Sequence, residues 1–164
     1  MQSGKILVAQ LEGTFVIKFT GDVRLTLCTT IDAFFSKMFT TPGFVGVVID
    51  LSEAEGIDST SLGLLAKLAI HAREQFQLKP IIICPNPNIF RLLSSMGFAQ
   101  VFEIKQGNEG LGNATDKLGE LPLISSDEHR IKEKIIEAHR VLMGLNEHNH
   151  NEFSDLVATL ESSG

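Results

Sequence analysis

The chain has few of the residues on which disulfide frameworks and thiolate metal sites depend. Its 164 residues include only two cysteines, Cys28 and Cys84. The two lie far apart and form no Cys-x-x-Cys pair, so a disulfide framework, a zinc site and a thioredoxin-like motif all lack support. Because free cysteine behaves as a small hydrophobic residue, we expect two ordinary buried thiols.

Positive charge and long apolar runs are also scarce. The chain carries 14 Lys and Arg against 20 Asp and Glu, a formal net charge of −6. Nucleic-acid binders cluster Lys and Arg on one face, and no cluster is visible, so no direct nucleic-acid partner is expected. No apolar run reaches the length of about 18 residues that spans a membrane, and residues 1–6 do not resemble a signal peptide. We expect a soluble, cytoplasmic protein with no membrane partner.

The chain does contain enough apolar residues, 43%, for one hydrophobic core. It is too short for two ordinary domains. Between residues 107 and 126, recurring Gly, Pro, Asn, Asp and Ser break both the helical and the strand periods. We therefore expect one domain over residues 1–106, a linker over 107–126 and a C-terminal helical extension over 127–164.

One stretch organises the domain, because its period changes in the middle. Residues 45–51 are rich in β-branched side chains and predict a buried strand that feeds a helix. Asp58 and Ser59 accept hydrogen bonds from the N–H groups of a helix's first turn, so Ser59 is placed at the helix start. The apolar stripe of this helix consists of Leu62, Leu65, Ala66, Ala69, Ala72 and Phe76.

The other patterns in residues 1–106 predict strands that alternate with helices. The expected elements are a hairpin over 6–11 and 14–19, a helix over 25–39, a strand over 79–84, a short helix over 88–96 and an edge strand over 101–104. Strands separated by helices need crossover connections and pair in parallel. The fold class predicted is α/β, with a mixed sheet of four or five strands flanked by helices.

Two amphipathic helices are expected in the extension, one beginning near residue 126 and one over 149–163. Each is too short to be stable alone in water, because helix nucleation is costly. They either dock on the domain or on each other, or they form an appendage that binds a partner or a second copy.

The sequence Ile49-Asp50-Leu51-Ser52, together with residues 57–63, resembles the signature of STAS domains, and most closely that of bacterial anti-sigma factor antagonists. The family pattern is an apolar residue, Asp and Leu, a short acidic turn, then Asp-Ser-Ser/Thr-Gly-Leu-Gly. The matching residues are Asp50, Leu51, Asp58, Ser59, Thr60, Leu62 and Gly63. Ser61 departs from it, standing where the family usually has glycine. The resemblance covers residues 5–106.

The resemblance implies a non-enzymatic regulatory protein without a cofactor. In the family the serine directly after the aspartate is phosphorylated, which is Ser59 here; Thr60 and Ser61 are neighbouring candidates. The unphosphorylated form binds an anti-sigma factor, and a serine kinase and a phosphatase set its state. The implied partner-binding residues are Asp22, Asp58, Ser59, Thr60, Ser61, Leu62 and Gly63. An alternative is a STAS regulatory or structural subunit of a larger complex, such as a transporter ATPase or a stress-sensing assembly.

The residues themselves leave other interpretations of Ser59 open. It can be a helix N-cap and nothing more. As a catalytic nucleophile it lacks the Gly-x-Ser-x-Gly elbow, and His71 lies about three turns along the same helix, out of reach as a base. The expectation is therefore that the protein is not an enzyme and that Ser59 is exposed.

Two charge patterns complete the candidates. His148 and His150, with neighbouring glutamates, form a histidine pair that is far more often solvated than metal-bound, so no metal site is expected. Four carboxylates around Ser59, those of Asp50, Glu53, Glu55 and Asp58, predict a negative local field. Phosphorylation would add about −1.5 to −2 charges to it.

Overall fold

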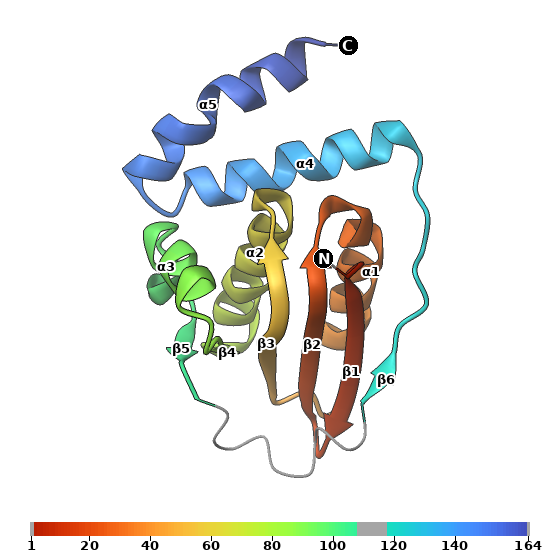
Figure 1. Cartoon of the computed structure of the whole chain (residues 1–164). Helices are drawn as coiled ribbons and strands as arrows, with labels where there is room; N and C mark the ends of the chain where they lie inside the picture. Colours follow the sequence, from red (N-terminus) through yellow and green to blue (C-terminus); the bar gives the residue numbers. More distant parts are fainter. Residues whose placement is uncertain (1, 108–117, 164) are drawn as a thin grey trace.

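The computed structural model describes residues 2–107 and 118–163 and has the predicted α/β fold. Residues 108–117 of the expected linker lie outside the described residues. The sheet has six strands in the order β5-β4-β3-β2-β1-β6 (Figure 1). Its strands are β1 Lys5–Leu11, β2 Thr14–Val23, β3 Gly46–Ile57, β4 Ile81–Ile83, β5 Glu103–Lys105 and β6 Gly119–Glu120.

The sheet is mixed, as predicted, because it combines a hairpin with crossovers. β1 and β2 are antiparallel, and Glu12 and Gly13 between them both have positive φ, as a two-residue hairpin of the primed type requires. β3, β4 and β5 follow β2 in parallel. β6 pairs antiparallel with β1. The prediction of four or five strands was therefore wrong. The sixth strand lies within the stretch expected to be a linker, where no local pattern predicts a strand.

β3 is longer than its β-branched run indicated. Residues 52–56, which the family signature implied to be a short acidic turn, continue the strand and pair with the end of β2 through two register shifts. The prediction of a turn there was wrong, because pairing with β2 overrides the low strand propensity of acidic residues. The strand therefore delivers Asp58 directly to the start of the following helix.

Three helices belong to the predicted domain: α1 Cys28–Phe39, α2 Ser59–Phe76 and α3 Pro87–Ser95. α1 and α2 lie side by side behind the sheet in the view of Figure 1. Their apolar stripes close over sheet residues such as Ile17, Ile49 and Leu51, all fully buried. Cys28 and Cys84 are buried free thiols, as predicted.

The extension forms the two predicted helices, α4 Glu128–Met143 and α5 Glu147–Ser162. α4 packs across α2, and α5 packs on α4 (Figure 1). The buried Asn149 fastens the turn between them, since its Nδ2 donates to the carbonyl oxygens of Met96 at 2.8 Å and Leu142 at 2.9 Å. The extension thus both docks on the domain and pairs with itself.

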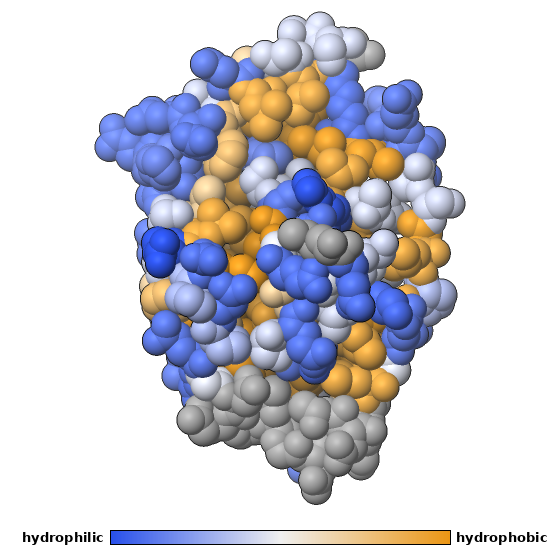
Figure 2. Space-filling model, in the orientation of Figure 1, coloured by the Kyte–Doolittle hydropathy of each residue, from blue (hydrophilic) through white to orange (hydrophobic). Residues whose placement is uncertain are grey.

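The outer surface of the extension is mixed in character. Figure 2 shows hydrophobic side chains between blue polar ones at the α4–α5 end of the molecule. Leu156 of α5 is 41% exposed. Among the described helices, none is long and apolar enough to cross a membrane.

Candidate functional site

The site is built on Asp58, which joins the end of β3 to the start of α2. Asp58 is the N-cap of α2: its Oδ1 accepts from the Ser61 N–H at 2.8 Å. Its Oδ2 accepts from the Leu25 N–H at 2.7 Å, at the turn that leads into α1. One carboxylate therefore satisfies N–H groups at the beginnings of two helical segments, which fixes the position of the next residue, Ser59.

Ser59 begins α2, as predicted, but the prediction that it is exposed was wrong. It is half-buried, and its Oγ lies 2.7 Å from Nε2 of His139 in α4. His139 itself is 2% exposed. The cause is the docking of α4, which joins residues 80 positions apart through a contact that no local pattern encodes.

The hydrogen bonds of His139 determine its tautomer. Nδ1 lies 2.7 Å from the carbonyl oxygen of Ile135, which only accepts, so Nδ1 carries a proton. In the neutral imidazole Nε2 is then the acceptor, and the Ser59 hydroxyl donates to it. Phe153 of α5 packs edge-on against the ring, with the ring centroids 4.9 Å apart. The imidazole is thus held between α2 and α5.

The Ser59–His139 pair brings to Ser59 a histidine from a distant helix, whereas His71, on the same helix, was the only base considered from the sequence. A serine hydroxyl hydrogen-bonded to an oriented imidazole is the first part of a nucleophile–base arrangement. However, α4, the helix that provides the imidazole, also fills the space in front of the Ser59 hydroxyl. Moving α4 away to admit a substrate would remove the imidazole too.

The rest of the predicted partner surface lies under or beside α4. Thr60, Ser61 and Leu62 are buried, and the Oγ of Ser61 has no hydrogen-bond partner among the described residues. Gly63 faces Ala138 so closely that a Cβ added to it would lie 2.3 Å from the Ala138 carbonyl oxygen. Glycine is therefore required here by the close approach of the two helices.

Two carboxylates of the predicted site, those of Asp22 and Glu53, are paired with a basic side chain. Asp22 accepts from Nε of Arg24 at 2.7 Å at the end of β2. Glu53 pairs with Lys18 on the neighbouring strand. Asp50 is 1% exposed, and its Oδ1 accepts from the Ser52 N–H. Of the four predicted acids, only Glu53 has an ion pair among the described residues, and only Asp58 contacts the first turn of α2. The negative local field around Ser59 stays a prediction.

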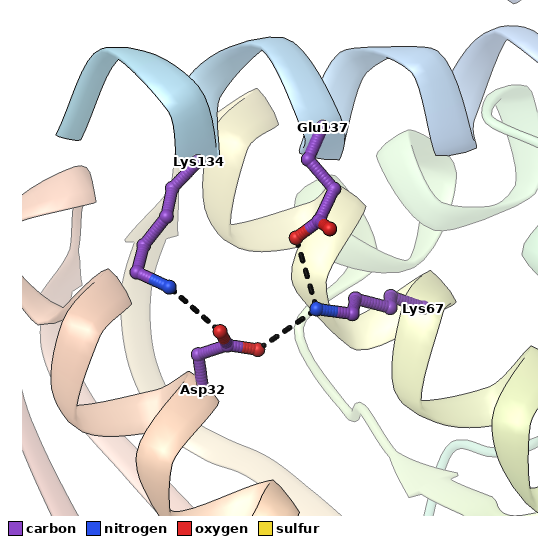
Figure 3. A network of polar contacts seen from close by, with 4 residues as sticks. All are labelled: Asp32, Lys67, Lys134 and Glu137. Atoms are coloured by element: carbon purple, nitrogen blue, oxygen red, sulfur yellow. Dashed lines mark hydrogen bonds and ion pairs between the residues drawn. The ribbon is translucent and has the colours of Figure 1, made fainter. Parts of the chain in front are cut away.

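A second set of polar contacts holds α4 near the site. Asp32 of α1 accepts from Lys67 of α2 at 3.1 Å and from Lys134 of α4 at 2.6 Å. Lys67 also donates to Glu137 of α4 at 2.9 Å. Figure 3 shows these four side chains pointing toward one another from three helices. We call the set of Asp32, Lys67, Lys134 and Glu137 the ionic latch.

The ionic latch changes the titration of two of its members. Burial raises the pKa of Asp32, but hydrogen bonds and charge from Lys134 and Lys67 outweigh burial and hold that pKa below its usual value. Burial lowers the pKa of Lys67, but hydrogen bonds to Glu137 and Asp32 and the charges of both outweigh it, so the net shift of that pKa is upward. Both groups therefore stay charged over a wide pH range.

The histidine pair at the start of α5 lies away from these contacts. His148 and His150 are exposed in the first turn of that helix. Among residues 2–107 and 118–163, no group of three or more His, Cys, Asp and Glu side chains is arranged to hold a metal ion.

Comparison with known proteins gives a family and a fold. The family model of the STAS domain matches residues 5–109. The fold is similar to the anti-sigma factor antagonist SpoIIAA in its unphosphorylated form, with a TM-score of 0.52 and 17% identity over 64% of this chain and 90% of that chain. The Bacillus cell fate determinant SpoIIAA in the phosphorylated form gives a TM-score of 0.51 and 17% identity, over 64% of this chain and 92% of that chain.

No curated protein matches the chain as a relative. The two SpoIIAA structures are covered almost completely by a match that leaves about a third of this chain outside it. This chain therefore has substantially more structure than those proteins need for the shared fold.

Proposed function

Because the chain belongs to the STAS domain family, we propose that it is an anti-sigma factor antagonist in a partner-switching pathway. In this proposal it binds an anti-sigma factor when Ser59 is unphosphorylated, and phosphorylation releases the partner. A serine kinase and a phosphatase acting on Ser59 would control sigma-factor-dependent transcription through it. The place of action would be the cytoplasm, without direct contact with nucleic acid or membrane.

The observation that carries the proposal is the position of Ser59. It is the first residue of α2, directly after an N-cap aspartate whose two oxygens are already occupied by backbone N–H groups. A phosphate at a helix N-terminus interacts favourably with the helix dipole, so the strands and helices of residues 1–106 should tolerate it once α4 has moved away from Ser59. A partner that docks over this turn must instead desolvate a group carrying about two negative charges. Phosphorylation should therefore act mainly on binding.

The protein would act without catalysis of its own. The Ser59–His139 pair has the beginnings of a nucleophile and a base, but the imidazole belongs to the helix that covers the serine. Access for a substrate and presence of the base exclude each other in this arrangement.

The test is a pull-down from the native cell with the full chain, Ser59→Ala and Ser59→Asp. Mass spectrometry identifies the partners and any phosphate on Ser59. We expect the unmodified chain and Ser59→Ala to capture an anti-sigma factor and Ser59→Asp to lose it. In a titration against that partner, Ser59→Asp should bind at least about tenfold more weakly, about 1.4 kcal/mol.

Ser94→Asp is the matched control, because it adds the same charge at an exposed position of α3, outside the ionic latch. It should leave capture unchanged. Equal affinities for the chain, Ser59→Ala and Ser59→Asp, together with no phosphate on Ser59 in cells, would reject the proposal.

The burial of Thr60, Ser61 and Leu62 together with the contact between Gly63 and α4 favours a second candidate function. A regulatory or structural subunit of a larger assembly, such as a transporter ATPase or a stress-sensing complex, can keep this turn covered permanently. In that case the captured proteins would be assembly components, and they would be captured equally by Ser59→Ala and Ser59→Asp.

A further inference from the structure

We propose that α4 and α5 together form an arm that competes with the protein's partner for the first turn of α2, so that the arm must leave before Ser59 can be phosphorylated or the partner can bind. This inference rests on the proposed function for the identity of the partner. The covering of Ser59 by the arm rests only on contacts within the chain.

His139 lies directly against the hydroxyl of the half-buried Ser59. In phosphorylation, the Ser59 oxygen bonds to the γ-phosphorus of a nucleoside triphosphate, the bond from that phosphorus to the bridging oxygen breaks, and the nucleoside diphosphate leaves. The hydroxyl proton passes to the kinase's base. The imidazole, 2.7 Å from Oγ and 2% exposed, occupies the space through which the phosphoryl group must come. The docked arm therefore protects Ser59 from the kinase.

The arm also occupies the surface on which a partner would dock. Gly63 lies one turn along α2 from Ser59, against the backbone of Ala138. Two helices in backbone contact leave no room for a third element between them. A partner that contacts Ser59 and Gly63 must therefore displace α4. Binding of the partner and docking of the arm at this surface are mutually exclusive.

One part of the contact between the arm and the domain is accessible to water and salt. Alongside its apolar contacts, α4 is tied to α1 and α2 by the ionic latch (Figure 3). The side chains of Lys67 and Glu137 are 39% and 48% exposed, so water and salt can compete for their contacts. If only molecules with the arm released can bind the partner, the apparent affinity for the partner equals the intrinsic affinity multiplied by the fraction of molecules in that released state. Releasing the arm should therefore raise both affinity and modification rate.

Access can be measured without knowing the kinase or the partner. Ser59→Cys places a thiol at the covered position, and its alkylation rate with iodoacetamide in the full chain reports how often the arm is away. Cys28 and Cys84 are buried, and burial raises the pKa of the Cys28 thiol to about 12, so both native thiols react slowly.

Ala138→Glu opens the arm in the Ser59→Cys background, because its side chain cannot fit against Gly63. We expect alkylation at least about tenfold faster. Ala158→Glu is the matched control on the exposed face of α5 and should leave the rate unchanged.

Lys134→Ala loosens the ionic latch without adding bulk and should give an alkylation rate between those of Ser59→Cys alone and its Ala138→Glu form. Lys132→Ala removes a lysine of α4 that has no ion pair among the described residues, and the rate should stay at the Ser59→Cys value.

Amide hydrogen exchange distinguishes opening from unfolding. In Ala138→Glu, protection should fall in α4 and in the first turn of α2, while β2 and β3 keep theirs. Equal alkylation rates in Ser59→Cys, its Ala138→Glu form and its Lys134→Ala form overturn the proposal. Faster alkylation together with lost protection in β2 and β3 also overturns it, because the arm would then be part of the domain's core rather than a cover.

The partner is tested separately with the same substitutions in the chain that keeps Ser59. Ala138→Glu should capture at least about tenfold more anti-sigma factor than Ala158→Glu. Faster alkylation with the same capture by both overturns competition between arm and partner. Faster alkylation with no partner captured by any variant supports the cover over Ser59 and rejects the proposed function, so the two failures are distinguishable.

Discussion

At the scale of the residue, a hydrogen bond between Ser59 and His139 joins the start of α2 to the extension. The neighbouring contacts all restrict it: Asp58 fixes the backbone before the serine, and Ile135 and Phe153 hold the imidazole. A pair held from both sides loses little entropy on forming, so the bond should contribute measurably to stability.

A double-mutant cycle measures this contribution. Ser59→Ala, His139→Ala and the double variant are unfolded in urea, and the free energies of unfolding are compared. We expect a coupling energy of about 0.5–1.5 kcal/mol, the usual net value of one hydrogen bond.

The control cycle pairs Ser59→Ala with His150→Ala, at an exposed position in α5. Distant positions without shared partners are additive, so this cycle should give no coupling beyond about 0.3–0.5 kcal/mol. A coupling of the same small size for Ser59 and His139 would show that the hydrogen bond does not contribute in solution.

At the scale of the element, α4 is positioned by charge as well as by its apolar stripe. Asp32 is the centre of the ionic latch, since it accepts from lysines of two other helices. Its lowered pKa means that the charged carboxylate is more favourable in the folded chain than in the unfolded one. Asp32 therefore stabilises the fold above the unfolded pKa of about 3.9, and this stabilisation is lost as the pH falls through the lower folded pKa.

Asp32→Asn should accordingly reduce the free energy of unfolding near neutral pH by about 0.5–1 kcal/mol for each of the two lysine pairs that it breaks. The difference from the wild-type chain should be constant from about pH 5 to 9 and shrink below about pH 4, because the wild-type carboxylate is then protonated too. Urea unfolding across that range is the measurement. Glu120→Gln, whose pair with Lys5 is exposed on both sides, is the control and should change little. A difference between Asp32→Asn and wild type that persists at low pH would mean that shape, not charge, places α4.

Which elements could be predicted from the sequence follows from how local their causes are. The hairpin, α1 and α2 have their signals in a few adjacent residues, such as Glu12-Gly13 and Asp58-Ser59. The second half of β3 and the short β6 depend on pairing with strands elsewhere in the chain. The family signature therefore implied a turn in place of the first, and composition predicted a linker in place of the second. The signature placed Ser59 correctly at a helix start. The contact of His139 with Ser59 could not be predicted, because no sequence pattern around His139 indicates that it packs against α2.

At the scale of the whole molecule, the extension contributes to the same hydrophobic core as the sheet and the first three helices. Ala138, Leu142 and Phe153 belong to that core, while the domain keeps a large one of its own around β2, β3 and α2. A chain ending at residue 126 loses Ala138, Leu142 and Phe153 but keeps the core around β2, β3 and α2. It should therefore fold, with lower stability.

Denaturant unfolding of this truncated chain should stay cooperative, with an m value lower by roughly a quarter, in proportion to the chain removed. A chain ending at residue 106 also loses β6 and its pairing with β1, and it should be less stable again. Aggregation or the loss of a cooperative transition in the chain ending at 126 would show that the arm completes the core.

During synthesis, the ribosome makes α4, the helix that covers Ser59, after it has made the start of α2. His139 follows Ser59 by 80 residues, and ribosomes add about 5–20 residues per second, so about 4–16 s pass between the two. A growing chain whose first strands and helices have folded therefore presents the start of α2 before its own cover exists. A protein that binds cotranslationally meets this surface without competition. The order of synthesis then decides whether the partner or the arm first contacts the start of α2. The relative affinities of the partner and the arm for this surface decide the outcome only later.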